Sequence, residues 1–142
     1  MTFVGSHLHN VDKKGRIFIP AKFREGLGDG SYIALPIDGQ ACLTIYPKER
    51  WDEIQRRIDA LPVMQQVVVQ RQFVAMASEA ECDGQGRILI PAMLRAYAHL
   101  DDRAYVVGAT TTIEIWSQSV WEEKLNAMTP ENYASVMKQF LF

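Results

Sequence analysis

The chain has 142 residues and a net charge of −2, with 48% hydrophobic and 23% charged residues, which is a normal composition for a soluble globular protein. No apolar run approaches the roughly 20 residues that span a bilayer, and the N-terminus lacks the basic and long apolar segments of a signal peptide. The overall charge does not indicate nucleic-acid binding, so any such function must come from local charge.

The first strands of the chain form a predicted hairpin. Residues 6–11, SHLHNV, alternate in polarity as a strand does. Asp12 can accept hydrogen bonds from the backbone just downstream, and Gly15 can adopt a positive φ, so these residues predict a turn. Residues 16–19, RIFI, then make the returning strand.

A short helix and two further strands follow this hairpin. Pro20 cannot extend a β-ladder but suits the first turn of a helix, which we expect over residues 21–27. Residues 32–35 and 42–46 predict strands with a turn between them, and Pro47 opens a longer helix. The apolar residues at helical spacing in that helix are Trp51, Ile54, Ile58 and Leu61.

The segment between the two halves of the chain, residues 62–80, is ambiguous. Three consecutive valines favour a strand, whereas the apolar spacing favours a helix, and we prefer the helix. The residues that carry the helical spacing are Met64, Val67, Val68, Arg71 and Ala75.

The second half repeats the order of the first, with strands predicted at GRILI, AYVVG and TIEIW. Ser119 and Glu122 form a plausible capping box for a helix with Trp121, Leu125 and Met128. A last helix after Thr129-Pro130 has an apolar stripe larger than a lone end helix needs, which predicts a homo-oligomer. The stripe consists of Tyr133, Val136, Met137, Phe140 and Leu141.

Two stretches of the chain carry one motif. DKKGRIFIPAKFR at residues 12–24 matches DGQGRILIPAMLR 71 residues further on, and the segments that follow also match at an offset of 70. Each half has about 70 residues, a size at which one core is only marginally stable, so the halves should pack together. We therefore expect a pseudo-symmetric pair: a first repeat at 6–50, a helical connector at 51–76, a second repeat at 77–120 and C-terminal helices at 121–142.

Positive charge is concentrated in the first copy of the motif. If Ile17 and Ile19 face the core, strand alternation points Arg16 outward beside the turn lysines. A two-stranded ribbon with such a tip can enter a major groove, where arginine reads guanine and lysines contact phosphates. The five cations within 13 residues are Lys13, Lys14, Arg16, Lys22 and Arg24.

Each motif residue also has a structural interpretation. For Asp12 and Asp83 we favour it, because an aspartate beside a glycine turn often pairs with the arginine and ties the hairpin. For Arg16 we favour contact with DNA, and for Arg87 the two interpretations stay equal, since Gly84 and Gln85 replace the turn lysines in the second copy.

The remaining motif arginines, Arg24 and Arg95, lie on the helices that follow the motif, where a structural role is favoured. One form that this role could take is an ion pair back to the motif.

Other chemical patterns are weaker. His7 and His9 share a strand face, but no third metal ligand has a recognisable spacing, so a solvated or hydrogen-bonded pair is favoured. GQGR lacks the third glycine of a dinucleotide loop and precedes a strand. Cys42 and Cys82 form no CxxC pair and predict two small buried thiols in a reducing compartment. We expect no catalytic residue, metal or cofactor, and expect packing roles for Trp51, Trp116 and Trp121.

Asp-x-x-Gly-Arg, then apolar-x-apolar-Pro, then arginine four residues on, resembles the AbrB-type swapped-hairpin DNA-binding domain. Two copies in a chain of this size resemble the MraZ family of bacterial transcriptional regulators. The resemblance covers nearly the whole chain, including the Tyr-Pro and tryptophan after the first half and the Ala-Ser-Glu at 77–79. The matching residues are Asp12, Gly15 and Arg16 in the first copy and Asp83, Gly86 and Arg87 in the second.

The resemblance implies an α+β fold, dominated by a double-split β-barrel of swapped hairpins and flanked by helices. It also implies a cytoplasmic, nucleoid-associated ring that binds short direct repeats in the promoter of its own operon, within a cluster of cell-division and cell-wall genes, and represses it. One rival is an AbrB-fold antitoxin that binds a protein through a disordered tail, although the tail here looks helical. A small enzyme using the cleft between the halves ranks last, because no nucleophile–base pair is visible.

Overall fold

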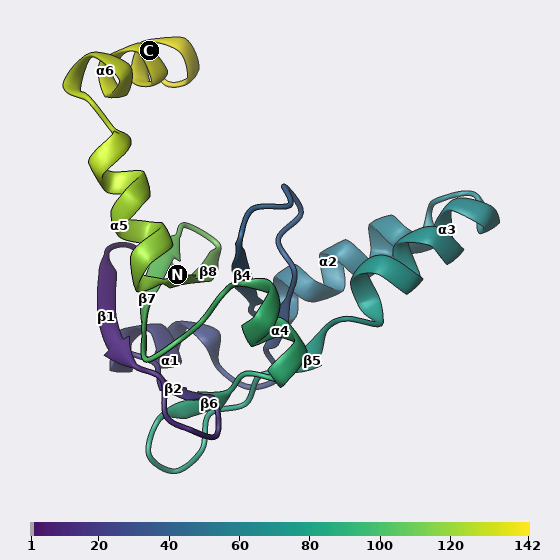
Figure 1. The fold of residues 1–142 in the computed structure, drawn as a ribbon. Helices are drawn as coiled ribbons and strands as arrows, with labels where there is room; N and C mark the ends of the chain where they lie inside the picture. Colours follow the sequence, from purple (N-terminus) through teal and green to yellow (C-terminus); the bar gives the residue numbers. More distant parts are fainter. Residues whose placement is uncertain (1) are drawn as a thin grey trace.

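Two antiparallel sheets form the centre of the protein, whose computed structural model describes residues 2–142 (Figure 1). The fold is therefore mixed α+β. The strands are β1 (Ser6–Asn10), β2 (Arg16–Phe18), β3 (Tyr32–Ala34), β4 (Cys42–Tyr46), β5 (Ser78–Glu79), β6 (Arg87–Leu89), β7 (Arg103–Ala109) and β8 (Thr112–Ser117). The helices are α1 (Ala21–Leu27), α2 (Lys48–Asp59), α3 (Val63–Val69), the π-helix η1 (Gln70–Val74), α4 (Ala92–Tyr97), α5 (Gln118–Ala127) and α6 (Pro130–Phe140).

The larger sheet has the strand order β1-β7-β8-β4-β3-β5, which is symmetric about its middle. The equivalent strands of the two repeats, β4 and β8, pair at the centre, with Leu43 opposite Ile115 and Ile45 opposite Ile113. Each outer strand pairs with the other repeat: β1 with β7, and β5 with β3. Neither repeat can therefore form its part of the sheet alone.

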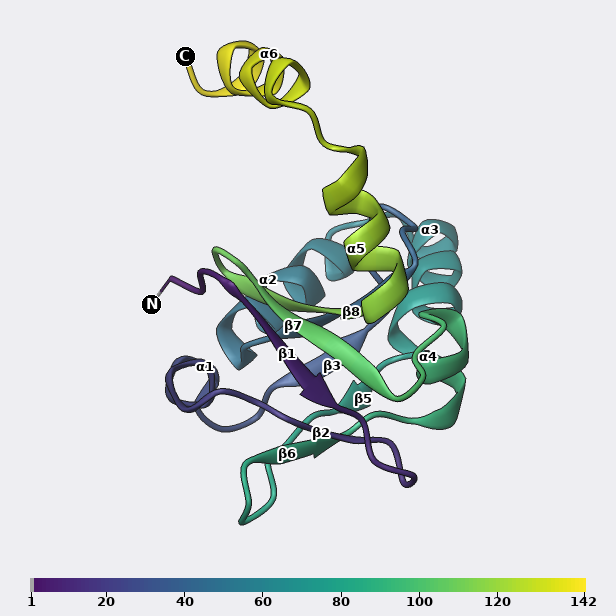
Figure 2. The same ribbon diagram turned by 60° about the vertical axis from the view of Figure 1, so that its left-hand side comes forward.

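The smaller sheet joins the repeats a second time. Strands β2 and β6 pair antiparallel, with Ile17 opposite Ile88. The pairing continues past the strands, because the N–H of Ile19 donates to the carbonyl of Gly86 and the N–H of Ile90 donates to that of Gly15, both at 2.9 Å. The two motifs of the sequence thus lie side by side (Figure 2).

The core between the sheets is built mainly from isoleucines, which confirms the predicted alternation of the motif strands. Arg16 and Phe18 are each about one-third exposed, whereas Ile17 and Ile19 are fully buried. Complete burial of such a side chain is worth about 1.5–3 kcal/mol, so the strand faces that meet here hold the repeats together. The fully buried isoleucines are Ile17, Ile19, Ile33, Ile45, Ile88, Ile90, Ile113 and Ile115.

The predicted dominance of β-structure is wrong, since the helices together hold more residues than the strands. Among residues 2–142, the strand pairing also leaves the larger sheet open at β1 and β5. The excess of helix comes from α2, α3, η1, α5 and α6. The first turns of α2 and α5 pack on the larger sheet through Trp51 and Trp121, whereas α3 and α6 project away from it (Figure 1).

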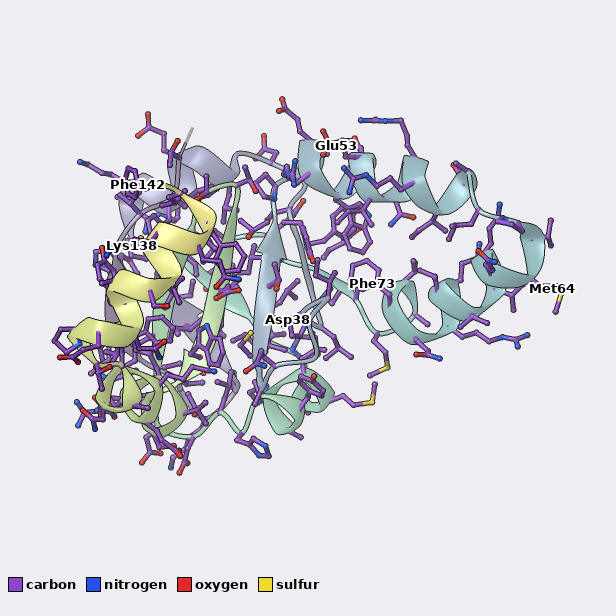
Figure 3. The ribbon with its side chains drawn as sticks, turned by 90° about the horizontal axis from the view of Figure 1, so that it is seen from above. Asp38, Glu53, Met64, Phe73, Lys138 and Phe142 are labelled. Atoms are coloured by element: carbon purple, nitrogen blue, oxygen red, sulfur yellow. The ribbon has the colours of Figure 1, made fainter. Side chains whose placement is uncertain are left out.

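The segment between the repeats is helical over residues 63–74, which confirms the preferred interpretation for most of residues 62–80, although residues 78–79 form β5. It forms α3 and η1, which run back beside α2 as a projecting arm with Met64 at its outer end (Figure 3). At the inner end of this arm, the Phe73 ring lies 5.5 Å from Trp51 and 6.2 Å from Tyr46. The valines occur on a helix because this aromatic contact, rather than strand propensity, decides the local structure.

The N-cap of helix α5 lies two residues before Ser119, the N-cap of the predicted capping box. The observed N-cap is Ser117, whose hydroxyl accepts from the N–H of Val120 at 3.2 Å, and Ser119 lies inside the helix. The capping-box prediction is therefore wrong in its position. Strand β8 runs directly into the helix at Ser117, which places the cap at that boundary.

The C-terminal helix α6 stands away from the rest of the chain (Figures 1 and 2). Thr129 caps it by accepting from the N–H of Asn132 at 3.1 Å, and both Met128 and Thr129 are extended. Its predicted apolar stripe is present but uncovered: Phe140 is 72% exposed and Leu141 is 68% exposed.

The two cysteines differ in burial, so the expectation of two buried thiols is half wrong. Cys42 lies on the central strand β4 and is fully buried, and burial raises the pKa of its thiol to about 12. Cys82 is exposed because it lies outside β5, at the start of the second motif.

Candidate nucleic-acid interface

The first motif turn is organised by one carboxylate. Asp12 accepts from the backbone N–H groups of Lys14 at 3.0 Å and Arg16 at 2.9 Å, and from the Arg16 Nε at 2.7 Å. Gly15 has a φ of +88°, a conformation that glycine adopts at no steric cost, and its N–H donates to the carbonyl of Asp12. The side chains of Lys13 and Lys14 are left exposed at the tip.

The second motif turn has the same geometry. Asp83 accepts from the N–H groups of Gln85 and Arg87 at 2.9 and 3.0 Å and from the Arg87 Nε at 3.0 Å. Gly86 has a φ of +79°. The chain therefore presents two equivalent turns next to each other, and they differ mainly in the side chains at their tips.

The two motif arginines are bound differently. In Arg87, Nη2 lies 3.0 Å from the Asp83 carboxylate, and Nη1 lies 3.7 Å from that of Asp12, so the side chain spans both turns. Arg16 contacts Asp12 through Nε alone, and within residues 2–142 neither of its terminal nitrogens has a hydrogen-bond partner. Arg16 therefore keeps the two donors that a bidentate contact needs.

Both aspartates remain ionised far into the acid range. The pKa of Asp12 is lowered to about 2, mainly because its carboxylate accepts from the backbone N–H of Arg16 and also because it pairs with the Arg16 guanidinium. For Asp83, the N–H of Arg87 is likewise the main cause of a lowered pKa. At neutral pH each turn therefore keeps its internal carboxylate–arginine pair.

The outer face of the β2–β6 ribbon combines cations with apolar groups. Arg16 lies opposite Leu89, and Phe18 lies opposite Arg87, so the two kinds of side chain alternate diagonally. Leu89 is 54% exposed, whereas Phe18 is partly covered by the guanidinium of Arg24, 5.0 Å above its ring. Leu89 was not among the predicted site residues, although the alternation used for the first strand identifies it in the second.

The helix arginines reach the opposite repeat. Arg24 donates to the carbonyl of Ile19 and lies against Gly86, while Arg95 donates to the carbonyls of Ile90 and Lys14. Within residues 2–142, neither arginine forms an ion pair, so the expected link to the motif carboxylates is wrong. The acceptors are carbonyls because each aspartate is already filled by its own turn and motif arginine.

The histidines face aromatic rings instead of each other. The His7 ring lies edge-on to Phe23 at 5.4 Å, and the His9 ring lies edge-on to Phe18 at 5.1 Å. Burial, and then the nearby His7, lower the pKa of His9. Over residues 2–142, no group of three histidine, cysteine or acidic side chains could hold a metal ion.

A second surface feature is an open groove between the arm and the loop before β4, close to Asp38 and Phe73 (Figure 3). Its volume is about 730 Å³. Arginines of α2 and apolar residues of α3 and η1 line it, and it lies apart from the motif turns. No helix in the described part of the chain is long and apolar enough to cross a membrane.

Fold and site together define a protein built by internal duplication, in which both copies of an Asp–Gly–Arg turn reach one surface. The family model described as "MraZ protein, putative antitoxin-like" matches residues 2–71 and again residues 73–139. The chain therefore belongs to the MraZ family.

Relatives from three bacteria support this membership, and each bears the name transcriptional regulator MraZ. The protein from Carboxydothermus hydrogenoformans is 42% identical, over 98% of this chain and 99% of its own length. The protein from Desulforamulus reducens is 39% identical, over 98% of this chain and 97% of its own length. The one from Moorella thermoacetica is 45% identical, over 85% of each chain.

Proposed function

We propose that this chain is a sequence-specific DNA-binding transcriptional regulator and not an enzyme. The observation that carries the proposal is the first motif turn, where the two terminal nitrogens of Arg16 have no partner among the described residues and lie beside two exposed lysines. The name transcriptional regulator, shared by the family members above, supports it.

Each side chain of the interface has a proposed role. Arg16 reads a base edge in the major groove, and Lys13 and Lys14 contact phosphates. Arg87 makes a weaker contact, since two carboxylates already surround it. Asp12 and Asp83 shape the turns rather than touch DNA.

We further propose that the motif strands form the swapped-hairpin, AbrB-like barrel of the family resemblance. The crossed backbone bonds from Ile19 to Gly86 and from Ile90 to Gly15 support this architecture. The corresponding division is a first repeat at 6–50, a connector at 51–76, a second repeat at 77–120 and C-terminal helices at 121–142.

The active form is proposed to be a homo-oligomer, specifically a ring. The apolar stripe of α6 is the proposed contact, because the chain's own body does not cover it. An isolated helix shorter than about 12 residues is marginal in water, so α6 needs a surface to stabilise it. A head-to-tail contact that closes on itself generates a ring.

The proposed target is a set of short direct repeats in the promoter of the protein's own operon, in a cell-division and cell-wall gene cluster, which the protein represses in the nucleoid. Successive subunits of a ring present the same turn in the same sense, so their sites point the same way. Repeats spaced by about one helical turn, roughly 10 base pairs, lie on one face of the duplex.

This phasing can be tested with altered promoter DNA. Inserting about 5 base pairs between two repeats places the second on the opposite face of the duplex, and affinity should fall towards that of a single repeat. Unchanged affinity would exclude in-phase reading by adjacent subunits. Tighter binding after one repeat is inverted would favour a two-fold dimer.

The proposed function itself is tested by a mobility shift with the DNA upstream of the protein's own gene. We expect a specific complex that survives excess unrelated DNA and weakens as salt rises. A scrambled duplex of equal length and composition is the control. Equal binding to both duplexes would contradict sequence-specific regulation.

The alternative is an antitoxin-like module that binds a protein, and the words of the family description favour keeping it. Co-purification of one stoichiometric protein partner, together with absence of the specific DNA complex, would support it over the regulator.

A further inference from the structure

Each motif turn lies beneath an arginine from the other repeat. The guanidinium of Arg95, on α4 of the second repeat, covers Gly15, so that a Cβ added there would lie 1.7 Å from Nη1. Arg24, on α1 of the first repeat, covers Gly86 in the same way, with Nη1 2.4 Å from an added Cβ. Both glycines are consequently buried although they belong to surface turns.

The two crossed contacts are not equal. Arg95 donates to the carbonyl of Lys14 at 3.2 Å, which fixes the peptide between Lys14 and Gly15, and it also donates to Ile90. Arg24 donates to the carbonyl of Ile19 in its own repeat and makes no described bond to the second turn. The turn with the lysines is therefore the one that a distant arginine holds directly.

We propose that Arg95 is a positioning residue for DNA recognition: it holds the first repeat's reading turn from the second repeat. The inference rests on the proposed DNA-binding function. Without the Arg95 bond, the Lys14 carbonyl loses its partner and the peptide is held only through the N–H of Gly15, which donates to the carbonyl of Asp12, so the exposed lysines are less restrained. Ordering the turn during binding then costs affinity that a preorganised turn keeps.

The residue type fits this role. Nη1 of Arg95 carries two N–H groups and donates to both carbonyls, while Nη1 and Cζ of the guanidinium occupy the space that a Cβ of Gly15 would need. Arg95 comes from α4 and covers Gly15 instead of extending from the tip of the turn, so the proposed role is contact with the protein and not with a phosphate.

The first test follows the turn in the free protein. Amide hydrogen exchange should become faster at residues 13–16 in Arg95→Ala, while exchange of core strands β4 and β8 and the melting temperature stay near wild type. Arg24→Ala is the matched control and should leave residues 13–16 unchanged. Unchanged exchange at these residues in Arg95→Ala would overturn the proposal whether or not the protein binds DNA.

The second test uses DNA affinity and its salt dependence. Arg95→Ala should bind a promoter duplex about tenfold more weakly, the cost of ordering one or two groups, with an unchanged salt slope. Arg95→Gln keeps an amide donor for the Lys14 carbonyl and should lose less. A salt slope smaller by about one, equal in both variants, would identify Arg95 as a phosphate contact instead.

The third test is a double-mutant comparison. Arg95→Ala should add little to the loss caused by Arg16→Ala, because both act through one turn, but should add fully to Arg87→Ala. The reverse pattern would contradict the crossed arrangement. If the wild-type protein forms no specific complex with the promoter DNA, the proposed function fails, and the exchange experiment still decides the positioning role. If Arg95→Ala does not fold, both the exchange and the affinity measurements use Arg95→Gln instead. Wild-type exchange at residues 13–16 together with weakened DNA binding in that variant would then overturn the proposal.

Discussion

The two repeats share one plan but end in opposite ways. In the first repeat, helix α2 follows the strand pair β3–β4. The chain then turns back through α3 and η1, so that Phe73 lies 5.5 Å from Trp51. In the second, Trp121 lies 5.5 Å from Trp116, but the continuing helix α6 points away and leaves this side uncovered. Ile58 in the first repeat is 5% exposed, whereas Met128, its counterpart 70 residues on, is 53% exposed.

The linkers explain this difference. After α2 the chain turns, with the N–H of Leu61 donating to the carbonyl of Ile58 and the Gln66 amide donating back to the carbonyls of Asp59 and Leu61. After α5, two extended residues carry the chain outward. The two repeats thus differ in whether the helix after the strand pair is covered by the next helix of its own chain.

The motif turns differ in a parallel manner. The first has exposed lysines and an arginine with free terminal nitrogens, whereas the second has Gly84 and Gln85 and an arginine bound by two carboxylates. Duplication has kept the geometry of the turns while their charge has diverged. The following substitutions test how far this asymmetry extends to function.

The largest effect is expected from Arg16→Ala, which should abolish specific DNA binding without unfolding the protein. One lost bidentate base contact costs about 1–3 kcal/mol, and the loss is repeated at every site of a multivalent assembly. Asp12 keeps its two backbone donors, so the turn should persist. Mobility shifts and thermal melting measure the two properties.

Arg87→Ala and Arg56→Ala are the comparisons for that variant. Arg87→Ala should weaken binding less than Arg16→Ala, and Arg56→Ala, an exposed change on α2, should have little effect. A greater loss of affinity in Arg87→Ala would show that free terminal nitrogens do not identify the arginine that contacts a base.

The next effect concerns the uncovered stripe of α6. Phe140→Glu with Leu141→Glu should dissociate the oligomer, because each buried side chain of this size contributes about 1.5–3 kcal/mol to a contact. Affinity for a promoter with several repeats should then fall by roughly 10²–10⁴-fold through lost multivalency. Light scattering and DNA titration are the measurements.

A matched control for the stripe places the same charges on the opposite face of α6, as Ser135→Glu with Gln139→Glu. The control should remain oligomeric. A wild-type protein that scatters as a 16.1 kDa monomer at micromolar concentration would refute the oligomer altogether.

A smaller effect is expected from exchanging the tips of the turns. Replacing Lys13 and Lys14 by glycine and glutamine should flatten the salt dependence of binding. The slope of log affinity against log salt concentration should fall by nearly two for each engaged turn, since about two fewer counterions are released. The converse change, Gly84→Lys with Gln85→Lys, should steepen it, and a Cβ at Gly84 meets nothing within 4 Å. A steeper slope in the first variant would contradict phosphate contacts by these lysines.

The smallest effect is on stability in acid. The folded pKa of Asp12 is about 2, below the value of about 3.9 in an unfolded chain. The ionised carboxylate therefore stabilises the fold fully above pH 4, and this contribution disappears as the pH falls from about 4 to about 2. Asp12→Asn should lose that part of the acid dependence of the melting temperature, and Asp83→Asn should lose less, because Asp12 also faces Arg87. Equal losses would mean that the contact between Asp12 and Arg87 does not contribute to stability.

The sequence by itself determined the local elements and the duplication. The turns at Asp12 and Asp83 follow from side-chain acceptors beside glycine, and the buried isoleucine face follows from strand alternation. These features depend on residues within a few positions of one another, which a pattern records. The charge difference between the turn tips is likewise a property of the sequence alone.

Only the tertiary structure decided which repeat supports which turn. Arg95 bonds Lys14 across 81 residues, and Arg87 reaches the Asp12 carboxylate of the other motif, contacts that exist because β2 pairs with β6. The position of α6 is equally a tertiary outcome: its apolar stripe is readable in the sequence, but only the structure shows that the extended linker directs it away from its own chain. Local preference sets how a segment folds, but contacts between segments distant in sequence set where it lies, because they depend on all the surfaces that compete for it.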